Sequence, residues 1–379
     1  MKILRTILFV LLALPVFSQQ QESDSLKNLL RDIKVGKVHV HDTVQANIMN
    51  SLVDLLPDEE WPQVNNALGE FLEAAYKRKS ITEKFYLHLQ ETVIANKGFY
   101  AQQKGKLTEA CNLYTQSLQL SEKNKNPYGI STMLNNLGAI FDEQGETDKA
   151  LDYYNRALGI RENNKDTAGL ISGYCNVAVI YERKKNPEEA LKLYKKSLFF
   201  CDENLLPAET ATTLTNLGYF YTKNGDPEFI GTMTAKMKEG QKKAIELFTR
   251  CLKIEEKYQL KDRMAHTYLV LANQYFLLND LLKAEQFGRK SYNMANEIGF
   301  AEHIKNSSSL LYQVYRTQNK FEEAYSMYDV FIGMKDSLVN SETRKVGSFE
   351  SIKVGNSIDV RLTQGEKESV LVTAEGVAL

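Results

Sequence analysis

Four regularly spaced asparagines are the residues whose chemistry stands out first. Asn96, Asn136, Asn176 and Asn216 are each separated from the next by 40 residues. An asparagine amide carries donors and an acceptor together, so one side chain can bond both the N–H and the C=O of an extended peptide. The alternative is that each amide bonds a carbonyl on a neighbouring helix, which would make the series part of the scaffold.

The other reactive side chains form no catalytic pattern. His39 and His41, beside Asp42, are the one histidine cluster, and they offer only two of the ligands that a metal site needs. The sequence has no glycine-rich phosphate loop, nucleophile elbow or paired-histidine zinc motif. We therefore expect no enzyme, no metal and no cofactor. The remaining histidines, isolated in the sequence, are expected on helix surfaces or in helix packing: His88, His266 and His303.

The four cysteines are far apart and have no metal-ligand spacing. Cys111, Cys175, Cys201 and Cys251 lie in helical patterns, so we interpret them as buried free thiols. A bridge between neighbouring helices stays open as an alternative if the compartment is oxidising.

Charge and the N-terminal sequence indicate where the chain works. With 47 Lys and Arg against 48 Asp and Glu, it lacks the basic excess that nucleic acid or anionic lipid would attract. Lys2 and Arg5, an apolar run over 7–17 and the small Ser18 are typical of a secretory signal peptide over 1–18, cleaved after Ser18. No later apolar run reaches membrane length, so no stable membrane insertion is expected. The sequence predicts a protein that is exported, periplasmic or secreted.

A repeat with a period of 40 residues organises most of the chain. One alanine column has successive separations of 40, 40, 54, 40 and 40 residues: Ala110, Ala150, Ala190, Ala244, Ala284 and Ala324. The extra 14 residues predict one insertion, at 226–240. Turn residues recur with the same period, and glycine and asparagine among them accept the left-handed conformation that ends a helix. These turn residues are Gly105, Gly145, Lys185, Gly225, Asn279 and Asn319.

The order of residues within one period resembles the tetratricopeptide repeat. The residues that carry the resemblance are Leu134, Leu137, Gly138, Phe141, Gly145, Ala150, Tyr154 and Ala157. The resemblance implies an all-α fold, a right-handed helical-repeat solenoid with six helix pairs over 80–345. The region 19–79 would hold a degenerate helical pair before it.

The same resemblance implies that a protein or peptide ligand lies in the concave face of the solenoid. The asparagines occupy the sixth position of four successive first helices, and in this family that position faces the groove. The same positional logic adds five neighbours: Arg183, Tyr219, Thr222, Lys223 and Arg316. Their mixed character suits a polar peptide better than a flat hydrophobic partner. Loops added to one repeat often carry binding specificity, but the 226–240 insertion fits a solvent-facing extension of the next helix equally well.

The pattern changes at the C-terminus, where apolar residues alternate with a period of 2 over 346–379. Three short strands are predicted, around 352–354, 358–362 and 370–374. The segment is similar to the opening of an auto-transporter adhesin head domain, a β-rich module that is much longer, so we expect a truncated module here.

These observations lead to two functional hypotheses. The first is a non-catalytic scaffold or adaptor of the bacterial cell envelope that binds a peptide or protein. The second is the extracytoplasmic sensor region of a histidine-kinase-type signalling protein without its membrane and catalytic parts. It rests on residues that resemble the exit helix of such sensors: Tyr328, Phe331, Met334, Lys335, Asp336, Ser337 and Leu338.

Overall fold

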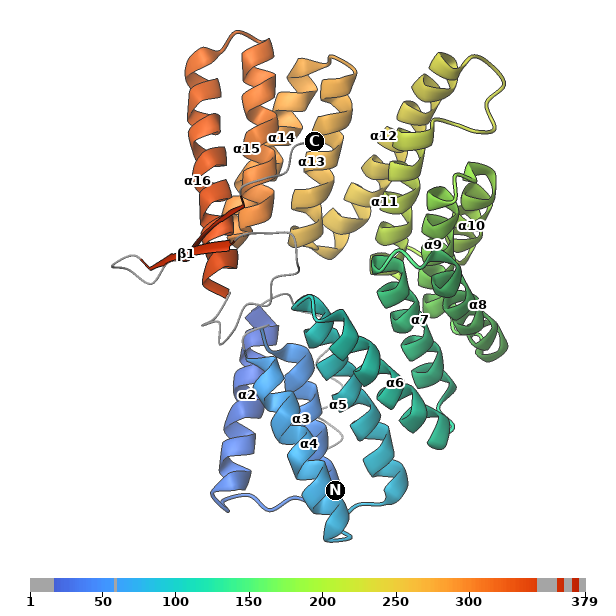
Figure 1. Cartoon of the computed structure of the whole chain (residues 1–379), viewed down its shortest axis with the longest axis vertical. Helices are drawn as coiled ribbons and strands as arrows, with labels where there is room; N and C mark the ends of the chain where they lie inside the picture. The colour runs from blue at the N-terminus through green and yellow to red at the C-terminus, as the bar shows by residue number, and fades with distance from the viewer. Residues whose placement is uncertain (1–16, 58–59, 346–359, 365–369, 375–379) are drawn as a thin grey trace.

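The chain folds into a curved stack of antiparallel helices (Figure 1). The computed structural model describes residues 17–57, 60–345, 360–364 and 370–374. Three helices come first: α2 (Phe17–Lys34), α3 (Asp42–Leu55) and α4 (Trp61–Lys77). The predicted N-terminal helix pair falls on α3 and α4. Residues 1–16 lie outside the described residues, so the signal peptide stays a prediction.

Six helical hairpins follow, in the span where the repeat predicts them. They are α5 (Glu83–Gln103) with α6 (Leu107–Lys123), α7 (Pro127–Glu143) with α8 (Thr147–Asn164), α9 (Thr167–Arg183) with α10 (Pro187–Phe200), α11 (Pro207–Asn224) with α12 (Met233–Tyr258), α13 (Lys261–Leu277) with α14 (Leu281–Ile298), and α15 (Ala301–Thr317) with α16 (Phe321–Lys345). The prediction of an all-helical repeat solenoid is confirmed. No helix in the described part of the chain is both long and apolar enough to cross a bilayer.

Backbone conformation explains why each hairpin turns where it does. All six predicted turn residues have positive φ, including Gly145 at 78° and Asn319 at 60°. Lys185 adopts φ 55° although it has a side chain that disfavours this region. Its neighbour Asn186 compensates, because its side chain accepts a hydrogen bond from Glu189 N and caps α10.

Close packing within the first five hairpins follows from one small residue on the first helix: Gly98, Gly138, Ala178, Gly218 or Ala272. A Cβ added to Gly138 would lie 2.8 Å from the ring of Tyr154, and one added to Gly218 would lie 2.5 Å from Phe248. A buried serine on the second helix then ties the hairpin together: Ser197 Oγ donates to Ile171 O at 2.9 Å. The same bond, across the same separation of 26 residues, recurs in two other hairpins, from Ser117 to Glu91 O and from Ser291 to Ala265 O.

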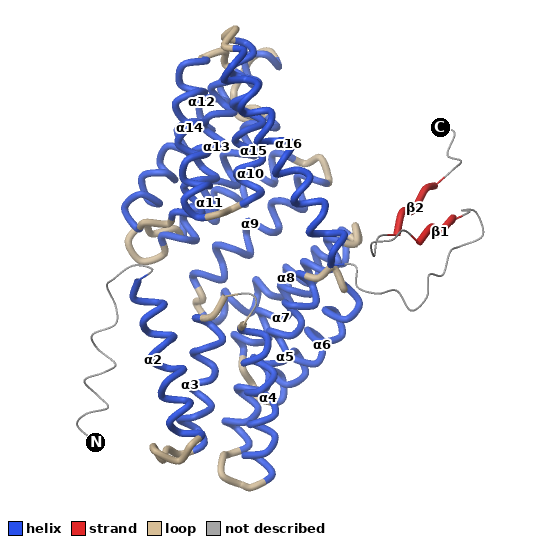
Figure 2. The backbone as a smooth tube through the Cα atoms, turned by 90° about the vertical axis from the view of Figure 1, so that its left-hand side faces the viewer, coloured by secondary structure: helices blue, strands red, loops and turns tan. Residues whose placement is uncertain are grey.

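Curvature arises because neighbouring first helices approach each other. Direct contacts join α5 to α7, α7 to α9, α9 to α11 and α13 to α15. Figure 2 shows the resulting stack from the side. The closely spaced first helices therefore form the concave face. α11 and α13, between which the insertion falls, meet mainly through α12.

The insertion is a short loop followed by extra N-terminal turns of α12. The extension packs back on the turn: Asp226 N donates to Lys236 O at 2.9 Å, and Gly240 lies against the backbone of Gly225. Ile230, at the tip of the loop, is 97% exposed. The helix-extension interpretation describes most of this segment, while a role in binding stays a prediction.

Two strands are described near the C-terminus. β1 (Val360–Gln364) pairs antiparallel with β2 (Val370–Ala374), with Leu362 opposite Val372. The predicted strand around 352–354 lies outside the described residues, and the likeness to an adhesin module stays a prediction.

Candidate peptide-binding face

The candidate site is the concave face, to which each first helix contributes the predicted asparagine at its sixth position or the residue equivalent to it. Asn96 Nδ2 donates to Asn65 Oδ1 on α4 at 3.1 Å, and Asn176 Nδ2 donates to Asn135 Oδ1 on α7 at 2.9 Å. Asn136 is half-buried, and its amide makes no hydrogen bond within the described part of the chain. The series therefore combines bonded and free amides.

Asn216 has a different partner, the buried thiol of Cys175. Burial raises the pKa of Cys175, and hydrogen bonds with Ser197, Thr213 and Asn216 oppose that shift. In three of the four repeats, then, the asparagine bonds a side chain of an adjacent helix. This is close to the scaffold alternative, although the partners are side chains rather than backbone carbonyls.

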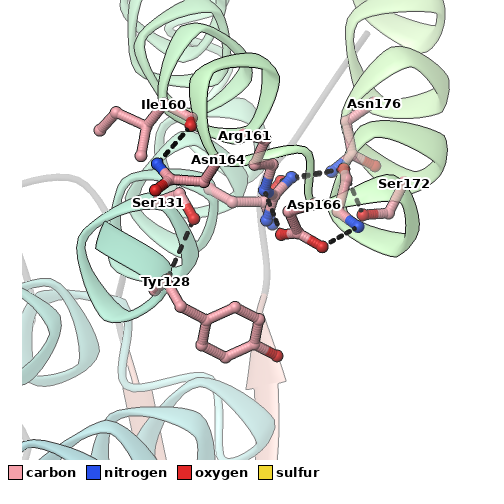
Figure 3. A network of polar contacts seen from close by, with 10 residues as sticks. Tyr128, Ser131, Ile160, Arg161, Asn164, Asp166, Ser172 and Asn176 are labelled. Carbon is pink, nitrogen blue, oxygen red and sulfur yellow. Dashed lines mark hydrogen bonds and ion pairs between the residues drawn. The ribbon is translucent and has the colours of Figure 1, made fainter. Parts of the chain in front are cut away.

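Asn176 belongs to a polar network around a buried arginine (Figure 3). Asn135 Oδ1, its acceptor, also lies 3.4 Å from Arg161 Nη1, which donates to Gly169 O at 2.9 Å. Asp166 Oδ2 lies 3.9 Å from Arg161 Nε. Burial lowers the pKa of Arg161, and the charge of Asp166 opposes that shift. Arg161, on the second helix of the preceding hairpin, therefore helps to hold the amide of Asn176 through Asn135.

Two glycines leave room for this arginine. A Cβ on Gly169 would lie 2.7 Å from Arg161 Nε, and one on Gly173 would lie 3.1 Å from Arg161 Nη1. The sequence analysis missed the network because the residue type at this position varies between second helices, so the repeat gives no consensus there. The equivalent positions hold Ser121, Cys201, Glu255, Ala295 and Lys335.

A ladder of polar contacts, here called the polar seam, crosses the C-terminal ends of four first helices. Gln102 Nε2 donates to Glu143, Arg183 pairs with Asp142, and Lys223 Nζ lies 3.9 Å from Glu182 Oε2. Each contact joins a residue of one repeat to a residue 41 positions further along the chain, so the same pair of positions recurs in successive repeats.

Two acids of the polar seam are sheltered, whereas the bases that pair with them are exposed. Asp142 and Glu182 have side chains that are 15% and 12% exposed, against 50% for Arg183 and 67% for Lys223. Tyr194 holds Glu182 in place, because its hydroxyl donates to Glu182 Oε1 at 2.7 Å. Guanidinium and ammonium donors therefore point outward along this rim.

Tyr219 forms an aromatic cluster with two histidines. Its hydroxyl lies 2.8 Å from His266 Nε2, and the ring of His266 is 5.6 Å from that of His303. The two histidines are far apart in the sequence but adjacent in the structure, so the prediction that they are isolated was wrong. The expected role of each in helix packing agrees with these contacts. His303 is 37 residues after His266, close to one period, which could have revealed the contact. Burial lowers the pKa of both histidines.

The remaining predicted site residues are less directly placed for a ligand. Thr222 Oγ1 donates to Gly218 O of its own helix at 3.0 Å. Arg316 lies on α15, where its guanidinium covers the ring of Tyr312 at 5.5 Å. The structure therefore brings Arg183, Tyr219 and Lys223 onto neighbouring helices and leaves Arg316 apart from them.

Other residues considered for chemistry have structural roles. His41 caps α3, its Nδ1 accepting from Thr43 N at 3.3 Å. All four cysteines are free thiols; Cys175 and Cys251 are buried, as expected, whereas Cys111 and Cys201 are only half-buried.

Comparison with known families tests the repeat directly. Two tetratricopeptide repeat models match the sequence, one over residues 90–163 and one over residues 171–198. The chain carries tetratricopeptide repeats. Both matches lie within the hairpins α5 to α10, which hold three of the four asparagines of the series, Asn96, Asn136 and Asn176. No curated protein matches the sequence.

Solved structures share the fold at low sequence identity. BtubC from P. vanneervenii is 19% identical with a TM-score of 0.50, and the match covers 64% of this chain and 92% of that one. A signal-transduction ATPase from Pyrococcus horikoshii with a tetratricopeptide repeat sensor is 15% identical with a TM-score of 0.50; the match covers 83% of this chain and 49% of that protein. These similarities establish the fold alone.

Proposed function

We propose that the chain is a non-catalytic scaffold that binds an extended, polar peptide segment of another protein on its concave face. The observation that carries the proposal is the alignment of donors and acceptors on successive first helices. Asn136 offers a whole amide on α7, and Arg183 and Lys223 present exposed donors on the two first helices that follow, α9 and α11. An extended peptide needs such groups at regular intervals for its backbone and polar side chains.

Export into the envelope is part of the proposal and rests on the N-terminal sequence. The sensor hypothesis stays an alternative without an observation that favours it, since the likeness to the ATPase is one of fold.

The test separates binding from scaffold roles by comparing two asparagines. A peptide is selected from a displayed random library against the immobilised protein, and its affinity is measured by fluorescence anisotropy. We expect Asn136→Ala to weaken it by about 1–3 kcal/mol with little change in melting temperature, because no scaffold bond is lost. Asn176→Ala should lower the melting temperature, since Asn135 Oδ1 loses the bond from the Asn176 amide.

Asn164→Ala is the matched control. Asn164 lies on α8, a second helix, and bonds only Ile160 O of its own helix. Unchanged affinity in Asn136→Ala together with loss in Asn164→Ala would place the binding surface on the convex side and refute the proposal.

A further inference from the structure

The first hairpin departs from the repeat at two core positions. The first hairpin has Lys97 at the seventh position of its first helix. The other five hairpins have a buried aliphatic residue there: Leu137, Val177, Leu217, Leu271 and Leu311. At the eleventh position the first hairpin has Ala101. The other five hairpins have a large aromatic residue there: Phe141, Tyr181, Tyr221, Tyr275 and Tyr315. The hairpin therefore lacks one ring and one apolar side chain.

The missing ring has an identifiable place. Phe141 stacks on Tyr153 of its second helix with ring centroids 5.2 Å apart, and Tyr275 stacks on Phe287 at 5.5 Å. In the first hairpin the corresponding pair is Ala101 and Leu113. Removing a large side chain from a packed core leaves a cavity that lowers stability, so such a change needs compensation.

A cavity of about 270 Å³ lies at this place, between α4, α5 and α6. Its walls include Trp61 and Tyr100, whose rings meet edge to face at 5.8 Å. Ala101, Leu113 and the buried Asn65 complete the interior. The cavity lies between the second helices α4 and α6 and the first helix α5, and Asn65 in its lining also accepts from Asn96 of the concave face.

The lining carries excess positive charge. Lys97 is half-buried and makes no ion pair or hydrogen bond among the described residues. Lys104 Nζ lies 4.9 Å from the centroid of the Tyr100 ring. Lys106 also lines the cavity, but Glu109 pairs with it at 3.2 Å. Two lysines thus remain without a carboxylate at a cavity with aromatic walls.

From this combination we propose that the cavity binds a small organic anion, with its carboxylate or phosphate group at Lys97 and Lys104 and a flat apolar body against Trp61 and Tyr100. Ammonium groups attract such anions as point charges, and aromatic walls shield the pair from water. The volume is slightly below that of pockets for drug-sized ligands, which limits the body to about one ring.

Trp61 makes the test direct, since it is the only tryptophan of the chain. Phenyl phosphate, phenol and inorganic phosphate are each titrated into the full-length protein while tryptophan emission is recorded. We expect a saturable change with phenyl phosphate that weakens as salt is raised, and weaker binding of the neutral ring and of the bare anion.

Two variants restore the residues of the other hairpins. Lys97→Leu removes the charge, and Ala101→Tyr fills the cavity; each should weaken phenyl phosphate binding by about tenfold or more, equivalent to about 1.4 kcal/mol. Both should keep or raise the melting temperature, because they complete the core. Lys104→Ala, at the exposed rim, should weaken binding without affecting folding.

Lys84→Gln is the control, since it removes an exposed charge from the same helix outside the cavity. The proposal is overturned if the unmodified protein shows no saturable response to phenyl phosphate. It is equally overturned if Ala101→Tyr and Lys104→Ala bind as tightly as Lys84→Gln, because the anion would then lie elsewhere.

Discussion

Asp166→Asn should destabilise the protein more than Arg161→Met, although both break the same ion pair. Two unit charges 3.9 Å apart interact by about 4 kcal/mol at an effective dielectric constant of 20. The Asp166 side chain is 21% exposed, so solvent screening should reduce the loss to about 2 kcal/mol. Asparagine can still accept from Gly169 N, as Asp166 Oδ1 does at 2.9 Å, so the helix cap is kept.

Arg161→Met removes the buried positive charge, so Asp166 no longer has a charge to compensate. The Arg161 side chain is only 6% exposed, and methionine fills a similar volume without a charge to desolvate. Two hydrogen bonds are lost, one to Gly169 O and a longer one to Asn135 Oδ1. We expect a change of about 1 kcal/mol or less, because Gly169 O still accepts from Ser172 Oγ and Asn135 Oδ1 still accepts from Asn176.

Urea denaturation of both single variants and the double variant measures these changes. The double-mutant cycle should show coupling, since the cost of Asp166→Asn disappears once the arginine is gone. If Arg161→Met is the more destabilising change, or if the two effects add without coupling, the charge argument is wrong.

Two further predictions follow from packing and titration. Gly218→Ala should destabilise the folded protein by about 1–2 kcal/mol, because the new methyl group meets the fully buried Phe248. Gly159→Ala in α8 should stabilise it by about 0.5–1 kcal/mol, because nothing lies within 4 Å of the new methyl group. Thermal melts of both variants check this, and equal effects would contradict it. Because burial lowers the pKa of His266 and His303, the unfolded chain takes up protons first as pH falls below about 6.5, so stability should decline from there until the lower folded pKa is passed. His266→Gln should reduce that decline in pH-dependent melts, and an unchanged decline would exclude the cluster as its source.

The repeat and its turns were predictable because they depend on local chemistry that recurs. Gly145 and Asn319 end helices through a backbone conformation that few residues adopt readily, and the small residue at Gly138 is required by the ring of Tyr154. A period of 40 residues exposes such requirements without any knowledge of the tertiary structure. Lys185 shows that the position matters more than the residue, since it adopts the same conformation.

The chemistry of the concave face was predictable only in part. The asparagine column could be located by its spacing, but whether each amide is bonded depends on what the adjacent helix offers. Asn176 bonds Asn135 on the preceding first helix. For Asn136, the residue at the equivalent place on the preceding first helix is Ala95, which has no acceptor on its side chain. Contacts such as His266 with His303 join different columns, and a search for exact repeats does not find them.

The concave face changes character at the insertion, and this bears on the peptide that we propose as its ligand. The asparagine column ends there, because the sixth position becomes Val270 on α13 and Leu310 on α15, both buried. The contact between Tyr219 and His266 begins at the same junction, where α11 and α13 meet mainly through α12. Asn136, whose amide is free among the described residues, can pair with a peptide backbone of any sequence, whereas the rings on the other side select for a side chain that packs against them. On the proposed function, a ligand that spans the junction would therefore be bonded through its backbone at Asn136 and selected by its side chains at Tyr219 and beyond.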